Sequence, residues 1–463
     1  MAGDSTIDWL GDAAVRHSDR PYLVGGDRTV SFGAFDDLTG RLAGGLSHQI
    51  DGRLVGLWAL NRMTTVAAMF ALWRAGASVL LLDARAGAER IRAQIHDIGV
   101  DAVFAADGAE IPDLGVAVVG TDAGQRTPPR RRRHIDDLAW VVHTSGSTGE
   151  PKPVRLTFGN LEAAASASAA VLDHRMSDRW LCALPISHVG GASILIRSAR
   201  EGSTVVLHRS FDPATVADTF AEGTVTIASL VAATLSRTLD ALGDRRAVGL
   251  RAVLVGGGPV PHGLVEQARS LGVPALPTYG MTETAAQVAT VPIGDEGTEE
   301  MAAVPGAEIG VRDDGRIVVR GPMVSPGYLG EPSRDPTDWL VTGDLGRLTR
   351  TGRLTVLGRA DDVIVSGGET VHPGPIEAQL RRLAGVVDVA VVGRPDPTWG
   401  SIVVAVYEGA ASPGELERHA RFHLAGSDIP RNWLRVDHLP RLPTGKPDRS
   451  AARRLAARDA TQG

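Results

Sequence analysis

LVGLWALNRMTTVAAMFALWRAGASVLLLD, residues 54–83, holds two apolar runs separated by a longer amphipathic segment. Residues 54–60 predict a buried strand, residues 64–77 predict a helix that ends near Gly76, and residues 78–83 predict a second strand. A strand, a helix and a strand in succession are typical of a parallel sheet that is covered by helices. This stretch therefore predicts an α/β fold.

The same alternation continues on both sides of this stretch. Upstream, Ser31 predicts the N-cap of a helix whose apolar residues recur at helical spacing, and downstream, residues 88–99 predict a further helix. Residues 251–261, RAVLVGGGPVP, predict a strand and a glycine turn, and residues 262–272 predict the helix that follows. Most of the chain up to about residue 300 therefore predicts mainly parallel sheets packed with helices.

The pattern changes after about residue 305. Residues 307–321 and 340–359 each predict an antiparallel hairpin with a turn at Gly, so a β-rich subdomain is expected there. Strands and helices then alternate again up to the C-terminus. We place a domain boundary at Arg359–Asp361, which predicts a large N-terminal domain, residues 1–358, and a small mobile α+β C-terminal domain, residues 359–463.

Composition excludes several classes of function. The 463 residues include 48 basic and 54 acidic ones, and the net charge of −6 gives no basic footprint for a nucleic acid. The dense basic run Arg130–Arg133 follows two prolines and is expected to be a solvated linker. The single cysteine, Cys182, excludes an intrachain disulfide and a cysteine metal cluster.

No membrane partner is expected either. No apolar run approaches the roughly 18 residues that a membrane span needs. Residues 1–10 contain Asp4 and Asp8 and lack a charged-then-apolar signal pattern, which predicts a cytoplasmic protein. The sequence leaves the oligomeric state open, a homo-oligomer included.

Residues 143–152, HTSGSTGEPK, form a small, polar, glycine-rich loop that ends in a lysine. Small residues let backbone N–H groups approach an anion, and Lys152 adds positive charge, so a phosphate group is the expected ligand. The spacing is not that of a P-loop. It is not a hydrolase nucleophile elbow either, because Ser145 stands where the first glycine should be relative to Ser147.

Two further polar loops, residues 256–259 and 279–284, also follow predicted strands. In parallel α/β sheets, ligands bind outside the carboxyl ends of the strands. The three loops are therefore expected to share one ligand site.

Five segments resemble the motifs of the AMP-forming adenylating enzymes, a family that includes acyl-CoA synthetases, luciferases and adenylation domains. They occur in the order and spacing of that family between about Ser31 and Arg449. The segments are TSGSTGEPK (144–152), YGMTET (279–284), TGDLG (342–346), GRADDVIVSGGETVHP (358–373) and PTGKPDR (443–449). The resemblance implies two steps: a carboxylate attacks the α-phosphate of ATP, and a thiol, usually that of coenzyme A, then displaces AMP.

The resemblance assigns the phosphate-binding residues. Glu283 and Thr148 are expected to hold Mg²⁺ between phosphate oxygens, since carboxylate and hydroxyl oxygens suit this ion. The alternative for the loop is a flexible turn without a ligand. The residues expected around the β- and γ-phosphates are Thr144, Ser145, Gly146, Ser147, Thr148, Gly149 and Lys152.

Other positions match the nucleotide and the reacting atoms. Tyr279 is expected to stack on adenine, with core packing as the alternative. Asp344 and Arg359 are expected to bind the ribose, the alternatives being a hairpin aspartate and a surface arginine. Thr282 is expected to donate to the α-phosphate, and Lys446 to bridge that phosphate and the attacking carboxylate, unless it is a solvated tail residue.

Gly256, Gly257 and Gly258 are expected to let the backbone approach the adenine edge, and a tight turn before a helix is the alternative. In the small domain, the resemblance makes Asp361 the hinge and assigns Gly367 and Gly368 to the coenzyme A step. Three positions depart from the commoner family pattern. They are Pro153, Phe158 and Pro375, which replace a usual glycine, histidine and glutamate.

The resemblance implies a carboxylic acid other than an amino acid as substrate. Amino-acid-activating members of the family usually carry an aspartate for the α-amino group at the positions of residues 184–191, and these residues, the first part of LPISHVGGASILIRS (184–198), contain none. This segment and residues 279–290 resemble the o-succinylbenzoate–CoA ligases of menaquinone synthesis. Other aryl- or acyl-CoA synthetases and carrier-protein ligases stay as the second hypothesis, and a binding protein without turnover as the third.

In that subgroup, His188, Gly190 and Gly191 would line the pocket of the aromatic ring, with a core histidine in a strand-to-helix turn as the alternative. O-succinylbenzoate carries a second carboxylate, which needs a cationic or hydrogen-bonded partner if it is buried. Arg197 is one candidate, unless it snorkels to solvent or forms a structural ion pair. Ser193 and backbone N–H groups compete for the role.

Overall fold

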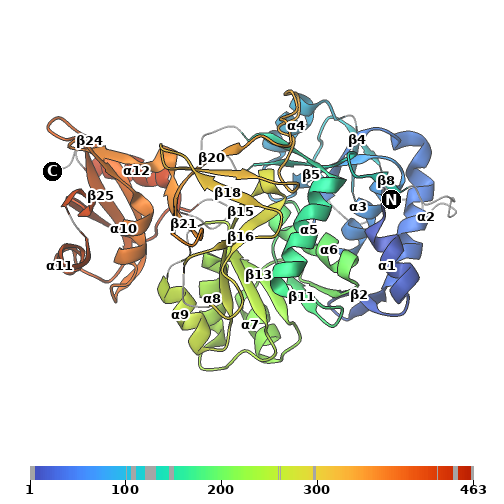
Figure 1. Cartoon of the computed structure of the whole chain (residues 1–463), viewed down its shortest axis with the longest axis horizontal. Helices are drawn as coiled ribbons and strands as arrows, with labels where there is room; N and C mark the ends of the chain where they lie inside the picture. Colours follow the sequence, from blue (N-terminus) through green and yellow to red (C-terminus); the bar gives the residue numbers. More distant parts are fainter. Residues whose placement is uncertain are drawn as a thin grey trace.

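The computed structural model describes residues 6–100, 102–105, 111–119, 132–144, 151–258, 260, 262–295, 299–424, 426–441 and 447–459. Figure 1 shows a large body that carries the N-terminus and a smaller body that carries the C-terminus, next to each other along the longest axis. The predicted segments Ser145–Gly149 and Lys446 lie outside the described residues.

A six-stranded sheet forms one layer of the large body, in the order β10, β9, β5, β4, β6, β7. Neighbouring strands in this sheet are parallel, except that β10 is antiparallel to β9. The β4–α3–β5 unit confirms the strand–helix–strand prediction for residues 54–83. The strands are β4 (Leu54–Ala59), β5 (Ser78–Asp83), β6 (Ala102–Phe104), β7 (Ala117–Val119), β9 (Leu138–His143) and β10 (Pro153–Thr157).

A nine-stranded sheet forms the second layer, in the order β17, β16, β15, β14, β13, β11, β12, β2, β3. The six central strands, from β15 to β2 in this order, are mutually parallel. Antiparallel pairing adds β16 and β17 at one edge and β3 at the other. The strands are β2 (Pro21–Gly25), β3 (Arg28–Ser31), β11 (Arg179–Cys182), β12 (Thr204–Leu207), β13 (Ile227–Val231), β14 (Ala252–Gly256), β15 (Ala275–Met281), β16 (Ala286–Thr290) and β17 (Ala302–Ala303).

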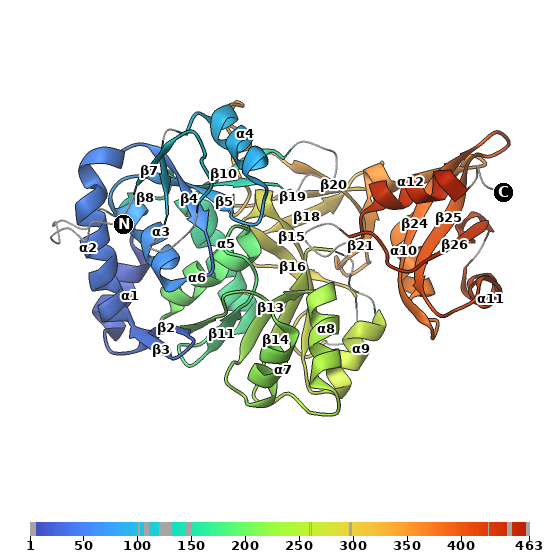
Figure 2. The same ribbon diagram turned by 180° about the vertical axis from the view of Figure 1, so that it is seen from behind.

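Helices cover both sheets, and their apolar faces join three buried clusters. Figure 2 shows α7, α8 and α9 beside β13 and β14, where they enclose the second cluster. Ser31 caps α2 as predicted, because its hydroxyl accepts the N–H of Ala34. The helices are α1 (Trp9–His17), α2 (Phe32–Ile50), α3 (Met63–Arg74), α4 (Ala88–Ile98), α5 (Phe158–Leu172), α6 (Val189–Glu201), α7 (Pro213–Ala221), α8 (Ala232–Leu242) and α9 (His262–Ser270).

The predicted β-rich subdomain is a four-stranded antiparallel sheet of β18 (Glu308–Val311), β19 (Arg316–Arg320), β20 (Leu340–Leu348) and β21 (Leu354–Arg359). Both predicted hairpins are present. Strand β21 ends at Arg359, and the short 3₁₀ helix η2 (Ala360–Asp362) leads into the smaller body. The boundary at Arg359–Asp361 stays a prediction.

The smaller body is α+β, as predicted, and has two cores of its own. Alternate residues of β24 and β25 enter different cores: Val389 and Val391 face one, and Ala390 and Val392 face the other. The elements are β22 (Ile364–Ser366), β23 (Glu369–Val371), α10 (Pro373–Leu380), β24 (Val386–Asp396), β25 (Gly400–Gly409), α11 (Pro413–His423), η3 (Gly426–Asp428), β26 (Asn432–Val436) and α12 (Arg449–Asp459).

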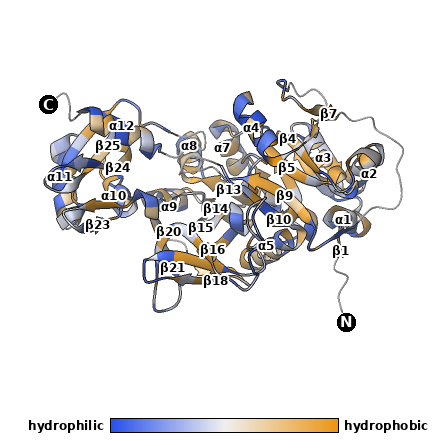
Figure 3. Ribbon diagram, turned by 90° about the horizontal axis from the view of Figure 1, so that it is seen from above, coloured by the Kyte–Doolittle hydropathy of each residue, from blue (hydrophilic) through white to orange (hydrophobic). Residues whose placement is uncertain are grey.

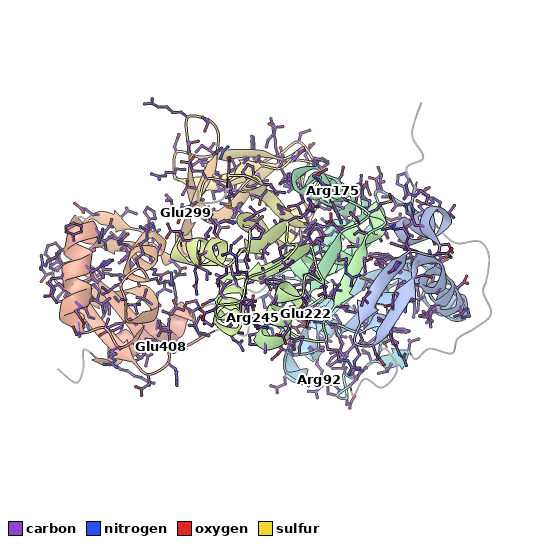
Figure 4. The ribbon with its side chains drawn as sticks, turned by 90° about the horizontal axis from the view of Figure 1, so that it is seen from below. Arg92, Arg175, Glu222, Arg245, Glu299 and Glu408 are labelled. Carbon is purple, nitrogen blue, oxygen red and sulfur yellow. The ribbon has the colours of Figure 1, made fainter. Side chains whose placement is uncertain are left out.

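Apolar strands lie inside the sheets of both bodies, whereas polar segments lie at the periphery (Figure 3). Charged side chains of both signs are spread along the molecule, with Arg92 and Arg245 on the large body and Glu408 on the smaller one (Figure 4). Among the helices of the described residues, none is long and apolar enough to cross a membrane.

The structure corrects two expectations. Residues 279–281 are not a loop: strand β15 continues to Met281, and the second half of the strand pairs with β16. Arg133 is not part of a solvated linker, since only 8% of it is exposed. Its guanidinium donates to Ala77 O at 2.7 Å, close to the C-terminal end of α3, and to Asp137 at 2.9 Å. A helix C-terminus favours such a cation.

Candidate active site

Tyr279, Asp344 and Arg359 form one hydrogen-bonded group, although they come from β15, β20 and β21. The Tyr279 hydroxyl donates to Asp344 Oδ2 at 2.9 Å, and Arg359 Nη1 donates to Asp344 Oδ1 at 3.3 Å. Asp344 and Arg359 are also paired in register across the hairpin. Burial raises the pKa of Tyr279, and the carboxylate of Asp344 raises it further. The phenol therefore stays a neutral donor to the carboxylate.

The backbone that follows Tyr279 is strained. The 3₁₀ helix η1 (Thr282–Thr284) contains Thr282 and Glu283, and the next two residues, Ala285 and Ala286, have φ values of 51° and 111°. Residues with side chains seldom adopt positive φ, and such strain gathers at functional sites. The strain thus supports a functional role for the turn that carries the predicted Mg²⁺ ligand.

The predicted phosphate loop joins β9 to β10, and its two ends are fastened to each other. The N–H of Thr144 donates to Lys152 O at 3.0 Å, and the N–H of Lys152 donates to Thr144 Oγ1 at 3.1 Å. Burial lowers the pKa of the preceding His143 to about 4, so its imidazole is neutral at pH 7. The loop residues from Ser145 to Gly149 lie outside the described part of the chain.

Tyr328 connects the phosphate loop with η1, and sequence reasoning missed it. Its hydroxyl donates to Glu283 Oε1 at 3.0 Å, and Lys152 Nζ lies 4.9 Å from the centre of its ring. A backbone bridge between Tyr328 and Val154 fixes this arrangement. The structure thus brings Lys152 and Glu283 to the same tyrosine, and their roles toward phosphate and Mg²⁺ stay predictions.

Gly256, Gly257 and Gly258 lie at the carboxyl end of β14, which is parallel to β13 and β15. Gly257 has φ +77°, so the backbone conformation by itself favours glycine there. The tight-turn explanation therefore holds, and the approach to adenine stays a prediction.

His188 precedes α6 and contacts the end of β5. Its Nε2 lies 3.5 Å from Asp83 Oδ2 and 3.4 Å from Arg85 Nη2. Burial by itself would raise the pKa of Asp83, but hydrogen bonds from His188 and Arg85 hold it well below its usual range. His188 is a partly exposed residue at the strand-to-helix turn rather than a core histidine.

The first turn of α6 contains Gly190 and Gly191. A Cβ atom at Gly191 would lie 2.3 Å from Pro185 O, so local packing is sufficient to explain this glycine. A Cβ atom at Gly190 would make ordinary contact with Leu184 at 3.5 Å. The predicted role of both glycines in lining a pocket stays a prediction.

Arg197 neither snorkels nor forms an ion pair with any described residue. It is 3% exposed, and its Nε and Nη2 are buried without a hydrogen-bond partner. Its guanidinium lies 5.3 Å from the ring centre of Trp180. Burial lowers its pKa to about 10, so it still carries a charge at pH 7. A buried, charged and unpaired guanidinium is costly, and an anionic ligand would remove that cost.

Two neutral side chains, like Arg197, have buried polar atoms without a hydrogen-bond partner among the described residues. Ser193, one turn before Arg197 on α6, has a buried hydroxyl without a partner. Gln287, on β16, is 5% exposed, and neither its amide oxygen nor its amide nitrogen has a hydrogen-bond partner within the described part of the chain. Strand β16 packs against α6. Sequence reasoning missed Gln287, although a glutamine inside the apolar strand AAQVAT is a detectable signal.

In the small domain, Gly367 and Gly368 form the turn between β22 and β23, with φ values of 61° and 84°. The ring of Trp399 covers this turn: a Cβ atom at Gly367 would lie 2.5 Å from it. The Arg431 guanidinium stacks on Trp399, 3.8 Å from the ring centre. An exposed aromatic ring and a cation thus flank the predicted coenzyme A residues, and neither was identified from the sequence.

Asp361 lies in η2, half-exposed, with its carboxylate 3.6 Å from Arg359 Nη2. It therefore adjoins the Tyr279–Asp344–Arg359 group at the exit of the large body. Of the three departures from the family pattern, Pro153 begins β10, Phe158 is a core residue that stacks on Trp9, and Pro375 lies exposed in the first turn of α10.

A large body of two helix-covered sheets, a small α+β domain and a tyrosine–aspartate–arginine group at their junction define a two-domain nucleotide-binding enzyme. The family model of AMP-binding enzymes matches residues 10–329, and the model of the AMP-binding enzyme C-terminal domain matches residues 375–446. The chain belongs to the AMP-binding enzyme family.

Curated relatives match along nearly the whole chain. The 2-succinylbenzoate–CoA ligase of Listeria monocytogenes serovar 1/2a is 32% identical over 96% of this chain and 98% of its own. That of Bacillus subtilis is 32% identical over 95% of this chain and 96% of its own. The o-succinylbenzoate CoA synthetase of Bacillus subtilis, solved with the acyl-adenylate intermediate, superposes with a TM-score of 0.87 at 31% identity, covering 96% of this chain and 97% of that one.

Proposed function

We propose that this protein is an ATP-dependent ligase that joins o-succinylbenzoate to coenzyme A through an acyl-adenylate. The relatives with this name cover nearly the full length of the chain, and the matching synthetase has also been solved with ATP and magnesium. In the first step, a carboxylate oxygen bonds to the α-phosphorus and pyrophosphate leaves. In the second, the thiolate of coenzyme A bonds to the acyl carbon and AMP leaves.

The nucleotide half of the site fits this chemistry. Asp344 would accept from the ribose hydroxyls, with Arg359 beside it, and Tyr279 would present its ring to adenine. Lys152 and Glu283 converge on Tyr328, so a cation for the phosphates and a carboxylate for Mg²⁺ are at hand. When bound, Mg²⁺ would neutralise the charge of the phosphate oxygens.

Lys446 and Thr282 complete the proposed catalytic set. A lysine side chain is positively charged at neutral pH, and Lys446 would stabilise charge on the oxygens of the pentavalent transition state. Thr282 lies in η1 beside Glu283, from where its hydroxyl would donate to the α-phosphate.

The buried guanidinium of Arg197 is the observation that favours o-succinylbenzoate as the acid substrate. O-succinylbenzoate has a ring carboxylate in addition to the succinyl carboxylate that is activated. Arg197 would pair the ring carboxylate, and the unpaired atoms of Ser193 and Gln287 would supply hydrogen bonds nearby. An acid with one carboxylate would leave this charge buried and unpaired.

Pyrophosphate release tests the proposal when it is measured with a panel of acids, with and without coenzyme A. The panel contains o-succinylbenzoate, benzoate, succinate, a fatty acid and several amino acids. We expect release with o-succinylbenzoate at least about 100-fold above the others, because an unmatched buried charge costs several kcal/mol. Preference for another acid would instead support the second hypothesis, another acyl- or aryl-CoA synthetase or a carrier-protein ligase.

Asp361 is proposed as the hinge between the domains, with residues 1–358 on one side and 359–463 on the other. Proline at position 361 would fix φ near −65° and hold the small domain in one orientation. We expect Asp361→Pro to reduce thioester formation by about 100-fold and adenylate formation by less than about threefold, because one orientation is lost. Single-turnover assays of each step provide the measurement. Equal rates in Asp361→Pro, the control Asp361→Ala and wild type would remove Asp361 as the hinge.

A further inference from the structure

The backbone around Tyr328 links strand β10 to the turn η1. Tyr328 forms a backbone bridge with Val154, on β10. The N–H of Ser325 donates to Glu283 O, in η1, at 2.8 Å, and the Ser325 hydroxyl donates to Arg155 O, on β10, at 2.6 Å. The backbone that carries the tyrosine is therefore fixed to both elements, and its side chain starts from a defined position.

The two ends of the Tyr328 side chain contact opposite charges. The hydroxyl donates to Glu283 Oε1 at 3.0 Å, and Lys152 Nζ lies over the ring, 4.9 Å from its centre. Burial raises the pKa of Tyr328, and the carboxylate of Glu283 raises it further, so the phenol stays a neutral donor. No ion pair joins Lys152 to Glu283, two residues that the structure describes.

These contacts leave both charged groups able to bind a ligand. An aromatic ring attracts an ammonium group through its negative face, and it does not occupy the N–H donors as a carboxylate would. The phenol engages one oxygen of Glu283, and a carboxylate has a second oxygen to offer. A direct ion pair between Lys152 and Glu283 would instead neutralise both charges and would have to break before a phosphate or a metal ion could bind.

We propose that Tyr328 is a positioning residue, which keeps Lys152 and Glu283 apart and oriented before ATP binds. The inference rests on the proposed function, because the roles of Lys152 toward phosphate and of Glu283 toward Mg²⁺ belong to it. It assigns two separable roles to one side chain. The ring acts through Lys152 on the affinity for ATP itself, and the hydroxyl acts through Glu283 on the affinity for the metal ion.

Tyr328→Phe removes the hydroxyl and keeps the ring. We expect it to bind ATP in the absence of metal as well as wild type does, because Lys152 keeps its place. The dissociation constant of Mn²⁺, used as a probe for Mg²⁺, is expected to rise about 10-fold or more in the protein–ATP complex, the usual loss when a metal-binding carboxylate loses its hydrogen-bond partner. Calorimetry with ATP and EDTA measures the first quantity, and electron paramagnetic resonance of Mn²⁺ measures the second.

Tyr328→Leu removes the hydroxyl and the ring together. Its affinity for Mn²⁺ is expected to fall as in Tyr328→Phe. In addition, its affinity for ATP without metal is expected to fall about 2- to 10-fold, because the lysine side chain must then lose its freedom when the nucleotide binds. The same two measurements apply, with the melting temperature as a check on folding.

The lysine content of the chain gives a readout that needs no ligand. The only lysines in the sequence are Lys152 and Lys446. Protein labelled with ¹³Cε-lysine therefore gives two ε signals, and Lys446→Ala identifies the one from Lys152. A group that lies over an aromatic ring is shifted upfield by the ring current. We expect this shift in wild type and in Tyr328→Phe, and its loss in Tyr328→Leu.

Tyr407→Phe is the matched control, because it removes a buried hydroxyl that has no hydrogen-bond partner in the described part of the chain. It is expected to change none of the three measurements. If Tyr328→Leu does not fold, wild type and Tyr328→Phe still provide the test. Failure of the proposed function has a different result: wild-type protein would form no adenylate from o-succinylbenzoate, whereas the binding and lysine measurements could still be made.

Two results would overturn the proposal. One is a wild-type Lys152 signal at the position of free lysine, which would show that the ring does not hold the ammonium group. The other is a Tyr328→Phe variant that binds Mn²⁺ as wild type does, or that loses equal affinity for ATP without metal and for Mn²⁺. The expected result is an upfield Lys152 signal in both proteins, together with a loss in Tyr328→Phe that is confined to the metal ion.

Discussion

Lys446→Ala is expected to slow adenylate formation by about 100- to 1,000-fold, the loss that follows removal of one preorganised donor to a developing oxyanion. Thioester formation from supplied acyl-adenylate should persist, because the charge aimed at the α-phosphate is no longer needed once pyrophosphate has left. ATP–pyrophosphate exchange and thioester release measure the two steps separately.

Lys446→Arg is the matched control, since it keeps the charge and changes its shape. Exchange in this variant should lie between wild type and Lys446→Ala. If both half-reactions fall equally in Lys446→Ala while the melting temperature is unchanged, the catalytic role proposed for this lysine is wrong.

Arg197→Ala is expected to cost about 2–5 kcal/mol toward o-succinylbenzoate, the range for removing one partner of a buried charge pair. This corresponds to a loss of roughly thirtyfold to several thousandfold in kcat/KM, at about 1.4 kcal/mol per factor of ten. The loss should nearly vanish for an analogue without the ring carboxylate. Measuring kcat/KM of both proteins with both compounds provides the test.

Arg200→Ala is a matched control on the same helix. Arg200 already pairs with Glu162 at 2.7 Å, so it has a protein partner that Arg197 lacks. Its loss should affect both compounds alike. Equal losses on the two compounds in Arg197→Ala would exclude a specific contact with the ring carboxylate.

Local sequence patterns predicted much of the fold, because the physics that they reflect is local. The β4–α3–β5 unit follows from apolar runs of strand and helix length, and the hairpins of β18–β21 follow from glycine turns between apolar strands. Strand β24 is an element whose packing the sequence pattern does not predict. Its run VVDVAVV is apolar on both faces because both faces are covered, so periodicity could not assign Val389 and Ala390 to different cores.

In the candidate site, too, some residues could be predicted from the sequence and others could not. Tyr279, Asp344 and Arg359 were predicted from motifs, and the structure brings them into contact. Tyr328 was missed because its partner Glu283 lies 45 residues away in sequence, and only tertiary contacts bring the two together, among them the bridge of Tyr328 to β10 and the hydrogen bond from the N–H of Ser325 to Glu283 O.

Arg133 shows that charge does not determine exposure. Inside the large body, its guanidinium donates hydrogen bonds to the carbonyl oxygens of Trp73 and Ala77, near the end of α3. The pattern of four arginines after two prolines carries no information about these acceptors. For Arg197, by contrast, the sequence left solvent, an ion pair and a ligand open. Its burial, with no ion pair to any residue that the structure describes, removes the first two.

The central claim is that this protein converts o-succinylbenzoate, ATP and coenzyme A to the coenzyme A thioester, AMP and pyrophosphate. The most direct measurement is mass spectrometry of the products of wild-type protein with these three substrates and Mg²⁺. We expect one AMP for each o-succinylbenzoyl-CoA, and no thioester without ATP. Absence of this thioester, while another acid yields one under the same conditions, would contradict the claim.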